Sequence, residues 1–245
     1  MLLVRRPPRP SIGSSRPGAI TRTGVPRNFS PSSHQLTKPV FERRFREYGL
    51  PRIIRTDNGA PFASIAIGRL SQLSVRWIRL GIFPELIEPA HPEQNARHER
   101  LHRTLKQETA RPPAEDHSAQ QKRFDWFFRF YNHERPHESF GQQTPASVYH
   151  PSERSFPGRL HKVEYPGHYE VRRVRRNGGI RWKNQWVCVT HVLAEEYVGF
   201  DEVDNGLWEV FYGPVRLGRF NERNSKIEDD QGRKYRKNVF PMSPD

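Results

Sequence analysis

The chain has 245 residues, 34% hydrophobic and 11% aromatic, which is enough for one or two small domains with a modest core. Its 41 Lys and Arg against 27 Asp and Glu give a net charge of +14, so nucleic acid is the first partner to consider. The single cysteine, Cys188, excludes an intramolecular disulfide and a cysteine-cluster metal site, which fits a reducing cytoplasm. No apolar run near the N-terminus approaches the ~20 residues of a membrane span, so we expect a soluble, cytoplasmic protein.

The composition changes along the chain and predicts four segments. Residues 1–38 are rich in Pro, Ser, Gly and Arg and hold seven Lys and Arg but no acid, so we expect them to be disordered. Residues 39–150 have helix and strand patterns, and residues 151–168, rich in Pro, Gly and His, are expected to be a linker. Residues 169–245 have a β pattern followed by a tail. The predicted fold class is α/β.

The second segment begins with a predicted helix over residues 39–48, which Gly49 can cap and Pro51 stops. A strand is expected at residues 52–56, ended by the turn sequence Asp57-Asn58-Gly59. We expect a second strand around residues 74–80, and then an irregular stretch through Pro84, Pro89 and Pro92.

Two further helices are predicted, one from about Glu93 to Glu108 and one that begins near Ser118. The second has aromatic residues at helical spacing, which indicates a face that packs in the core. These residues are Phe124, Phe127, Phe128 and Tyr131.

Six short strands are predicted after the linker, with hairpin turns at Asn177-Gly178 and Asp204-Asn205-Gly206. Short strands joined by tight turns are typical of a small barrel, and we expect this segment to fold on its own. The expected strands are residues 169–174, 180–182, 186–189, 197–203, 207–211 and 215–220.

The helix around Glu99 is predicted to have one polar, cationic face and one apolar face. On a helical wheel Asn95, His102, Arg103 and Lys106 fall on the side of Glu99, whereas Leu101 and Leu105 fall near the opposite side. A carboxylate among cations suits a divalent metal ion that meets a phosphate backbone.

Three segments together resemble the integrase catalytic core of bacterial insertion-sequence transposases, a retroviral-integrase-like family. They are Phe45–Gly59, the helix around Glu99 and Lys106, and Tyr131–His137, and the resemblance runs from about residue 39 to residue 220. It implies a partial RNase H-like core followed by a small SH3-like β-barrel, and a homo-oligomer that acts on DNA. In the family, three carboxylates in the order Asp, Asp, Glu hold two Mg²⁺ ions for DNA cleavage and strand transfer.

By this resemblance Asp57 is the second catalytic, metal-binding carboxylate and Glu99 is the third. Asn95 and Lys106 match positions on the DNA-facing side of the last core helix, and Arg103 on the same face is a third expected DNA contact. No Asp precedes Asp57, and the acids Glu42 and Glu47 fall on a predicted helix, not on a central strand. We therefore expect an N-terminally truncated transposase remnant that binds DNA and lacks catalysis.

Two other functions stay open. A non-catalytic nucleic-acid-binding protein would use the basic, aromatic β segment, although a solvated strand face would explain the same arginines. The string His98-Glu99-Arg100-Leu101-His102 is also that of a zinc-protease helix, but burying its flanking guanidinium groups would be costly. The residues of the basic β segment are Arg172, Arg173, Arg175, Arg176, Arg181, Trp182 and Lys183.

Overall fold

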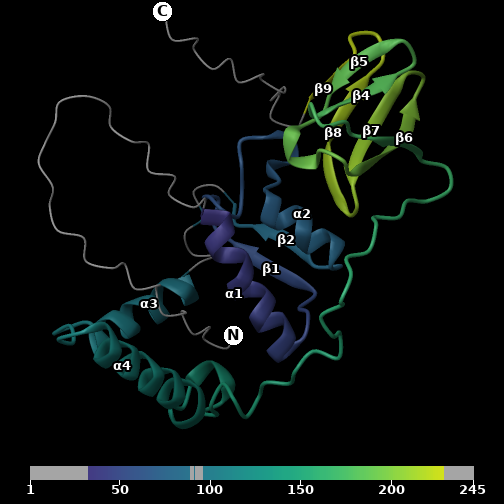
Figure 1. Ribbon diagram of the computed structural model, residues 1–245. Helices are drawn as coiled ribbons and strands as arrows, with labels where there is room; N and C mark the ends of the chain where they lie inside the picture. The colour runs from purple at the N-terminus through teal and green to yellow at the C-terminus, as the bar shows by residue number, and fades with distance from the viewer. Residues whose placement is uncertain (1–32, 89–90, 92–95, 229–245) are drawn as a thin grey trace, which may run out of the picture. The chain divides into compact units, whose positions relative to one another are not determined.

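The computed structural model describes residues 33–88, 91 and 96–228 (Figure 1). Contacts divide the chain into two compact units, one helical and one with both helix and strands in its described residues. Unit 1 comprises the residues up to Gly49 together with residues 90–153, and unit 2 comprises residues 50–89 and the chain from Arg154 onward. No helix in the described ranges is long and apolar enough to cross a membrane.

Unit 1 is helical. It contains α1 (Ser33–Tyr48), α3 (Ala96–Thr109) and α4 (His117–Arg129), and α3 packs against α4. Asp116 caps α4 by accepting a 2.7 Å hydrogen bond from the amide of Ala119, and a π-helical turn at Phe130–Glu134 follows the helix. The two predicted helices are thus confirmed, and Phe127 on the predicted aromatic face is completely buried.

Helix α1 ends where the sequence predicts and begins earlier. The amide of Gly49 donates to the carbonyl of Phe45 at 3.0 Å, and Gly49 has a φ of 76°, which favours glycine. The helix includes residues 33–38, for which disorder was expected, and it continues through Pro39, which has no main-chain N–H to donate. Residues 1–32, the rest of that segment, lie outside the described residues.

Unit 2 begins with a strand–helix–strand motif. Strand β1 (Ile53–Thr56) pairs in parallel with β2 (Phe83–Leu86), and α2 (Gln72–Arg79) connects them. The prediction of a strand around residues 74–80 is therefore wrong, because most of these residues belong to α2. Strand β2 lies in the stretch that was predicted to be irregular. The helix forms because Ser71 and Ser74 make a capping box, and because Leu73 and Trp77, four residues apart, are both buried.

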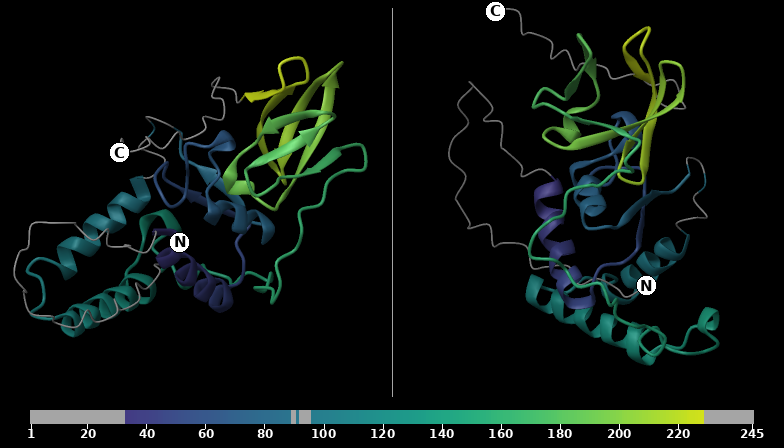
Figure 2. Two further views of the ribbon diagram at one scale, coloured as in Figure 1. Left: turned by 45° about the horizontal axis from the view of Figure 1, so that its top comes forward. Right: turned by 90° about the vertical axis from the view of Figure 1, so that its right-hand side faces the viewer.

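The rest of unit 2 consists of two antiparallel sheets (Figures 1 and 2). One is a hairpin of β4 (Gly179–Trp182) and β5 (Gln185–Cys188). The other has five strands in the order β3-β6-β7-β8-β9. The six predicted strands are confirmed, whereas β9 was not predicted, and the described strands do not join into one closed barrel. The five strands are β3 (Glu170–Arg173), β6 (Tyr197–Asp204), β7 (Leu207–Tyr212), β8 (Val215–Asn221) and β9 (Lys226–Glu228).

The hairpin, the five-stranded sheet and the strand–helix–strand motif share one hydrophobic core. Ile180 and Val187 of the hairpin and Phe200 of the sheet are completely buried in it. The same core contains residues from the segment before and within α2, namely Ile67, Leu70, Val75 and Ile78. The β segment, expected to fold on its own, therefore has its core completed by residues 67–78.

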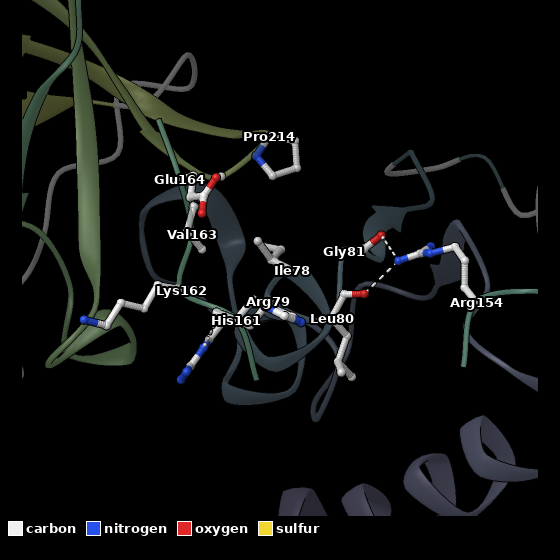
Figure 3. A pocket seen from close by; sticks show the side chains of 11 residues that line it. Ile78, Arg79, Leu80, Gly81, Arg154, His161, Lys162, Val163, Glu164 and Pro214 are labelled. Atoms are coloured by element: carbon white, nitrogen blue, oxygen red, sulfur yellow. Dashed lines mark hydrogen bonds between the residues drawn. The ribbon is translucent and has the colours of Figure 1, made fainter. Parts of the chain in front are cut away.

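Residues 151–168 contain no helix or strand, but they are bound to unit 2 through side chains. The guanidinium of Arg154 donates to the carbonyls of Pro51, Leu80 and Gly81 at 3.0, 2.8 and 2.9 Å (Figure 3). It thereby joins the start of β1 to the end of α2. Further along, the hydroxyl of Tyr165 donates to the carbonyl of Tyr197 at 2.7 Å.

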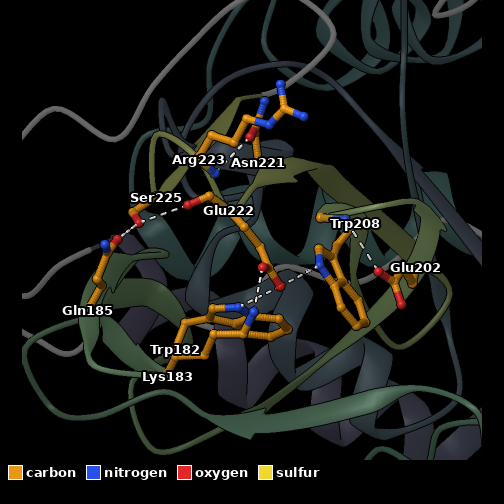
Figure 4. A network of polar contacts seen from close by, with 10 residues as sticks. Trp182, Lys183, Gln185, Glu202, Trp208, Asn221, Glu222, Arg223 and Ser225 are labelled. Atoms are coloured by element: carbon orange, nitrogen blue, oxygen red, sulfur yellow. Dashed lines mark hydrogen bonds and ion pairs between the residues drawn. The ribbon is translucent and has the colours of Figure 1, made fainter.

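One carboxylate, that of Glu222, joins the hairpin to the sheet (Figure 4). The indole groups of Trp182 and Trp208 each donate to its Oε1 at 3.0 Å, and Lys183 donates to its Oε2 at 2.6 Å. The hydrogen bond from Lys183 and those from the two indoles lower the pKa of Glu222. Because Trp182 and Lys183 belong to the hairpin and Trp208 to β7, the orientation of the hairpin on the sheet is defined.

The shared core predicts that a residue of α2 stabilises the β sheets. We expect Ile78→Ala to lower the free energy of unfolding of unit 2 by about 2–4 kcal/mol, because it leaves a cavity where Ile78 is 6% exposed. Urea unfolding followed by tryptophan fluorescence measures the effect. The matched control is Ile65→Ala, since Ile65 is 88% exposed in the same unit. Equal effects of the two variants would contradict a shared core.

The contacts of Arg154 predict a second effect on stability. Arg154→Ala leaves the three carbonyls without this donor, so we expect a loss of about 1–3 kcal/mol in the unfolding free energy. Hydrogen exchange of the amides in β1 and β2 should accelerate in the same variant. Arg159→Ala removes an exposed arginine five residues away and should change neither quantity. Unchanged exchange in Arg154→Ala would show that this contact is dispensable.

Candidate active site and nucleic-acid interface

Asp57 stands directly after β1, in unit 2, and its side chain is exposed. Its Oδ1 accepts a 3.2 Å hydrogen bond from the amide of Gly59, which makes the turn that the sequence predicts. The neighbouring Asn58 donates to the carbonyl of Ile87 at 2.9 Å, and the amide of Ile87 donates to the carbonyl of Thr56 at 3.0 Å. These bonds hold the ends of β1 and β2 together, so the main chain at Asp57 is fixed while its carboxylate faces solvent.

Strand β1 is paired on one side only. Its partner is β2, and Arg55 lies opposite Glu85, with Nε 2.6 Å from Oε2. This hydrogen bond from Arg55 lowers the pKa of Glu85. On its other side β1 has no strand partner within the described ranges, and Ile53 is 56% exposed. Strand β1 therefore presents an unpaired edge and an exposed apolar side chain in the described part of the chain.

Glu99 lies near the start of α3, in unit 1, and is exposed. The helical wheel is confirmed: Leu101 is buried, whereas Arg103 and Lys106 are exposed on the same helix as Glu99. Near the other end, Glu108 pairs with Arg135 at 3.7 Å. Helix α3 therefore presents a carboxylate and two cations to solvent.

Some predicted site residues lie outside the described part. Asn95 is one of them, and the placement of the side chain of His98 is likewise not described. Asp57 belongs to unit 2 and Glu99 belongs to unit 1, so the surroundings of each carboxylate are described within its own unit. Within the described ranges, no three His, Cys, Asp or Glu side chains are grouped as a metal site would require.

The basic β segment contains both paired and unpaired residues. Trp182 is buried, and Arg173 and Lys183 form ion pairs with Glu195 and Glu222. Arg172 likewise contacts Glu170 and lies over the ring of Trp182, 5.5 Å from its centroid. Arg176 is exposed and pairs with Glu195 at 3.9 Å. Arg175 and Arg181 are exposed, with no acidic partner among the described residues.

One exposed aromatic residue of this segment was missed in the sequence. Trp186 is 42% exposed on β5. Alternation along the strand could have indicated it, because Val187 points into the core and its neighbour Trp186 therefore points outward. In a sequence with five tryptophans, however, an exposed one has no compositional signal.

A cleft of about 540 Å³ lies between the C-terminal end of α2, residues 161–164 and the turn from β7 to β8 (Figure 3). Its guanidinium groups are engaged by the protein. Arg79 donates to Glu196 and to the carbonyl of His161, at 3.0 and 3.1 Å, and Arg154 donates to the three carbonyls described above. The cleft therefore serves the packing of unit 2 and is not a candidate catalytic site.

Comparison with known families identifies part of the chain. The family model described as the integrase core domain matches residues 80–145. The matched segment contains β2, α3 and α4, and with them Glu99, Arg103 and Lys106. It also contains the segment Tyr131–His137, one of the three on which the resemblance rests, whereas Asp57 lies before it. The resemblance is confirmed over residues 80–145, where the chain is similar to the integrase core domain.

Proposed function

We propose that this chain is a DNA-binding protein of the transposase and integrase type that does not itself catalyse strand transfer. The observation that carries the proposal is the integrase core match over residues 80–145, which includes the exposed cationic face of α3. Arg103 and Lys106 on that face are the proposed DNA contacts, because cations that neutralise phosphates release counterions from DNA. Asn95 is proposed as a third contact on the family resemblance alone.

In this proposal Asp57 and Glu99 are the family's second and third carboxylates. Both are exposed, and carboxylate oxygens are the ligands that Mg²⁺ prefers. The donors therefore fit Mg²⁺ in chemical type. They do not fit the family's two-ion site in number, because that site uses three carboxylates in the order Asp, Asp, Glu, and this sequence has no aspartate before Asp57.

The finer fold assignment also belongs to this proposal. A parallel β1–β2 pair with a connecting helix supports part of an RNase H-like sheet. An SH3-like barrel is supported by the contacts of β5 with β9 and of β3 with β4, which bring the hairpin against both edges of the five-stranded sheet. The shared core supports the same assignment.

The second candidate function is nucleic-acid binding without any transposase-type role. The exposed Arg175, Arg176 and Arg181 favour it, since they would bind a polyanion whatever the ancestry of the chain. Zinc proteolysis has less support, because Glu99 and His102 are exposed, whereas a catalytic zinc helix is buried beside its metal.

The proposed DNA face of α3 predicts an electrostatic effect. The double variant Arg103→Glu, Lys106→Glu should weaken binding to a mixed-sequence duplex about tenfold or more at low salt, and reduce the salt slope by about 2. Fluorescence anisotropy at a series of salt concentrations measures both quantities. The matched control is Lys122→Glu, Arg129→Glu on α4, which changes the charge equally at exposed positions. Equal losses in both double variants would exclude α3 as the DNA face.

The incomplete carboxylate set predicts the absence of catalysis. With terminal-repeat duplexes of the element and Mg²⁺ or Mn²⁺, we expect neither cleavage nor strand transfer, because two ions need their bridging oxygens held within a few tenths of an ångström. A gel-based strand-transfer assay is the measurement, with Asp57→Ala and Glu99→Ala as controls. Metal-dependent activity that both variants abolish would overturn the proposed defect.

A further inference from the structure

Charge is strongly separated within the β segment of unit 2. Residues 174–194, which contain the β4–β5 hairpin, hold four Lys and Arg and no Asp or Glu. Residues 195–228, which contain β6 to β9, hold eight Asp and Glu and only four Lys and Arg. A polyanion that approaches this segment is therefore attracted to the hairpin side and repelled by the strands β6 to β9.

Ion pairs sharpen this separation. Arginines on the neighbouring strands are paired: Arg216 and Arg219 share the carboxylate of Glu209, and Arg173 binds Glu195. Arg175 and Arg181 have no acidic partner among the residues that the structure describes, and both are exposed. Free positive charge on the β segment thus lies at the hairpin, at the turn that leads into it, and at Arg223 and Lys226 between β8 and the end of the described chain.

The outer face of the hairpin carries an indole ring with one side covered. Trp186 on β5 lies opposite Arg181 on β4, so both side chains are on the same face. The ring lies so close over Gly179 that a Cβ at Gly179 would overlap it. One face of the indole ring is covered by Gly179. The side chain of Trp186 is nevertheless 42% exposed.

The hairpin that bears this ring is held rigidly. Its inner face is buried, with Ile180 and Val187 completely inaccessible. At the turn of the hairpin, Trp182 and Lys183 donate hydrogen bonds to Glu222 (Figure 4). At the open end of the hairpin, the amide of Val189 donates to the carbonyl of Gly178 at 2.9 Å. A rigid ring loses little conformational entropy when it stacks on another ring.

We propose that the outer face of the β4–β5 hairpin binds unpaired DNA bases, with Trp186 as the stacking surface and Arg181 as the phosphate contact. Every base has a flat π face, so an open indole face recognises single-stranded DNA without a sequence preference, and adjacent cations bind its backbone. In a duplex the bases are stacked on one another and do not reach such a ring. This function goes beyond the duplex binding proposed for α3 and uses a different surface.

The test uses the full chain and a fluorescent twelve-nucleotide oligo-dT, with a mixed-sequence duplex as the second probe. Trp186→Ala should weaken oligo-dT binding about tenfold and change duplex binding by less than about twofold. The matched control is Trp126→Ala, because Trp126 is 49% exposed and lies on α4 in unit 1. It should change neither affinity. Equal losses for both probes, or the same loss in the control, would overturn the proposal.

A third probe keeps the test independent of how well the variants fold. An abasic oligonucleotide of the same length keeps the phosphates and removes the bases, so the unmodified protein should bind it about tenfold more weakly than oligo-dT. Trp186→Ala should not distinguish the two probes, and Trp186→Phe should give an intermediate ratio. Equal binding of oligo-dT and the abasic strand by the unmodified protein would exclude base stacking. If the protein bound oligo-dT as expected but did not bind the duplex, the result would instead contradict the proposed duplex-binding face of α3.

Discussion

The contact between residues 67–78 and the five-stranded sheet is the interaction on which the rest of unit 2 depends. Residues 67–78 approach the sheet closely because glycines, which have no side chain, lie at the contact. A Cβ at Gly213 would lie 2.8 Å from Cγ2 of Ile78, and a Cβ at Gly68 would lie 2.6 Å from Cδ2 of Leu217. Since α2 connects β1 to β2, burying its apolar face against the sheet also holds the parallel strand pair and, with it, the turn at Asp57. The candidate carboxylate is therefore positioned by a core that extends into the C-terminal strands.

Positive charge contributes to function only where acids leave it free. The net charge of +14 indicates a nucleic-acid partner, yet on the β segment Arg216 and Arg219 share the carboxylate of Glu209 and Lys183 pairs with Glu222. Such pairs add little to stability at a surface, but they remove cations from any phosphate contact. The exposed cations of α3 in unit 1 and of the β4–β5 hairpin in unit 2 then act on two separate surfaces. This arrangement fits two kinds of DNA contact, one to the duplex backbone and one to unpaired bases.

Local patterns in the sequence predicted those elements whose signals are local. Turn residues and alternating apolar residues predicted six strands of the β segment, and aromatic residues at helical spacing predicted α4. Helix α2 was mistaken for a strand because polar and apolar residues alternate from Ser74 to Trp77. The Ser71–Ser74 capping box is a local signal that was missed, whereas burial of the helix against the sheet depends on tertiary contacts. Strand β9 has three residues, too few for a periodic signal. The ring of Trp186 over Gly179 likewise becomes visible only when the strands are paired.

The proposed DNA binding and catalysis by two metal ions would make very different demands on this chain. Binding needs cations near phosphates, and exposed residues such as Arg103 and Lys106 satisfy this with tolerant geometry. Catalysis by two metal ions needs several carboxylate oxygens fixed relative to one another. Here Asp57 is fixed by the ends of β1 and β2 in unit 2, and Glu99 by the buried face of α3 in unit 1, so each carboxylate depends on a different packing arrangement. Each proposed cationic surface, in contrast, lies within a single unit, so its cations are positioned by one packing arrangement alone.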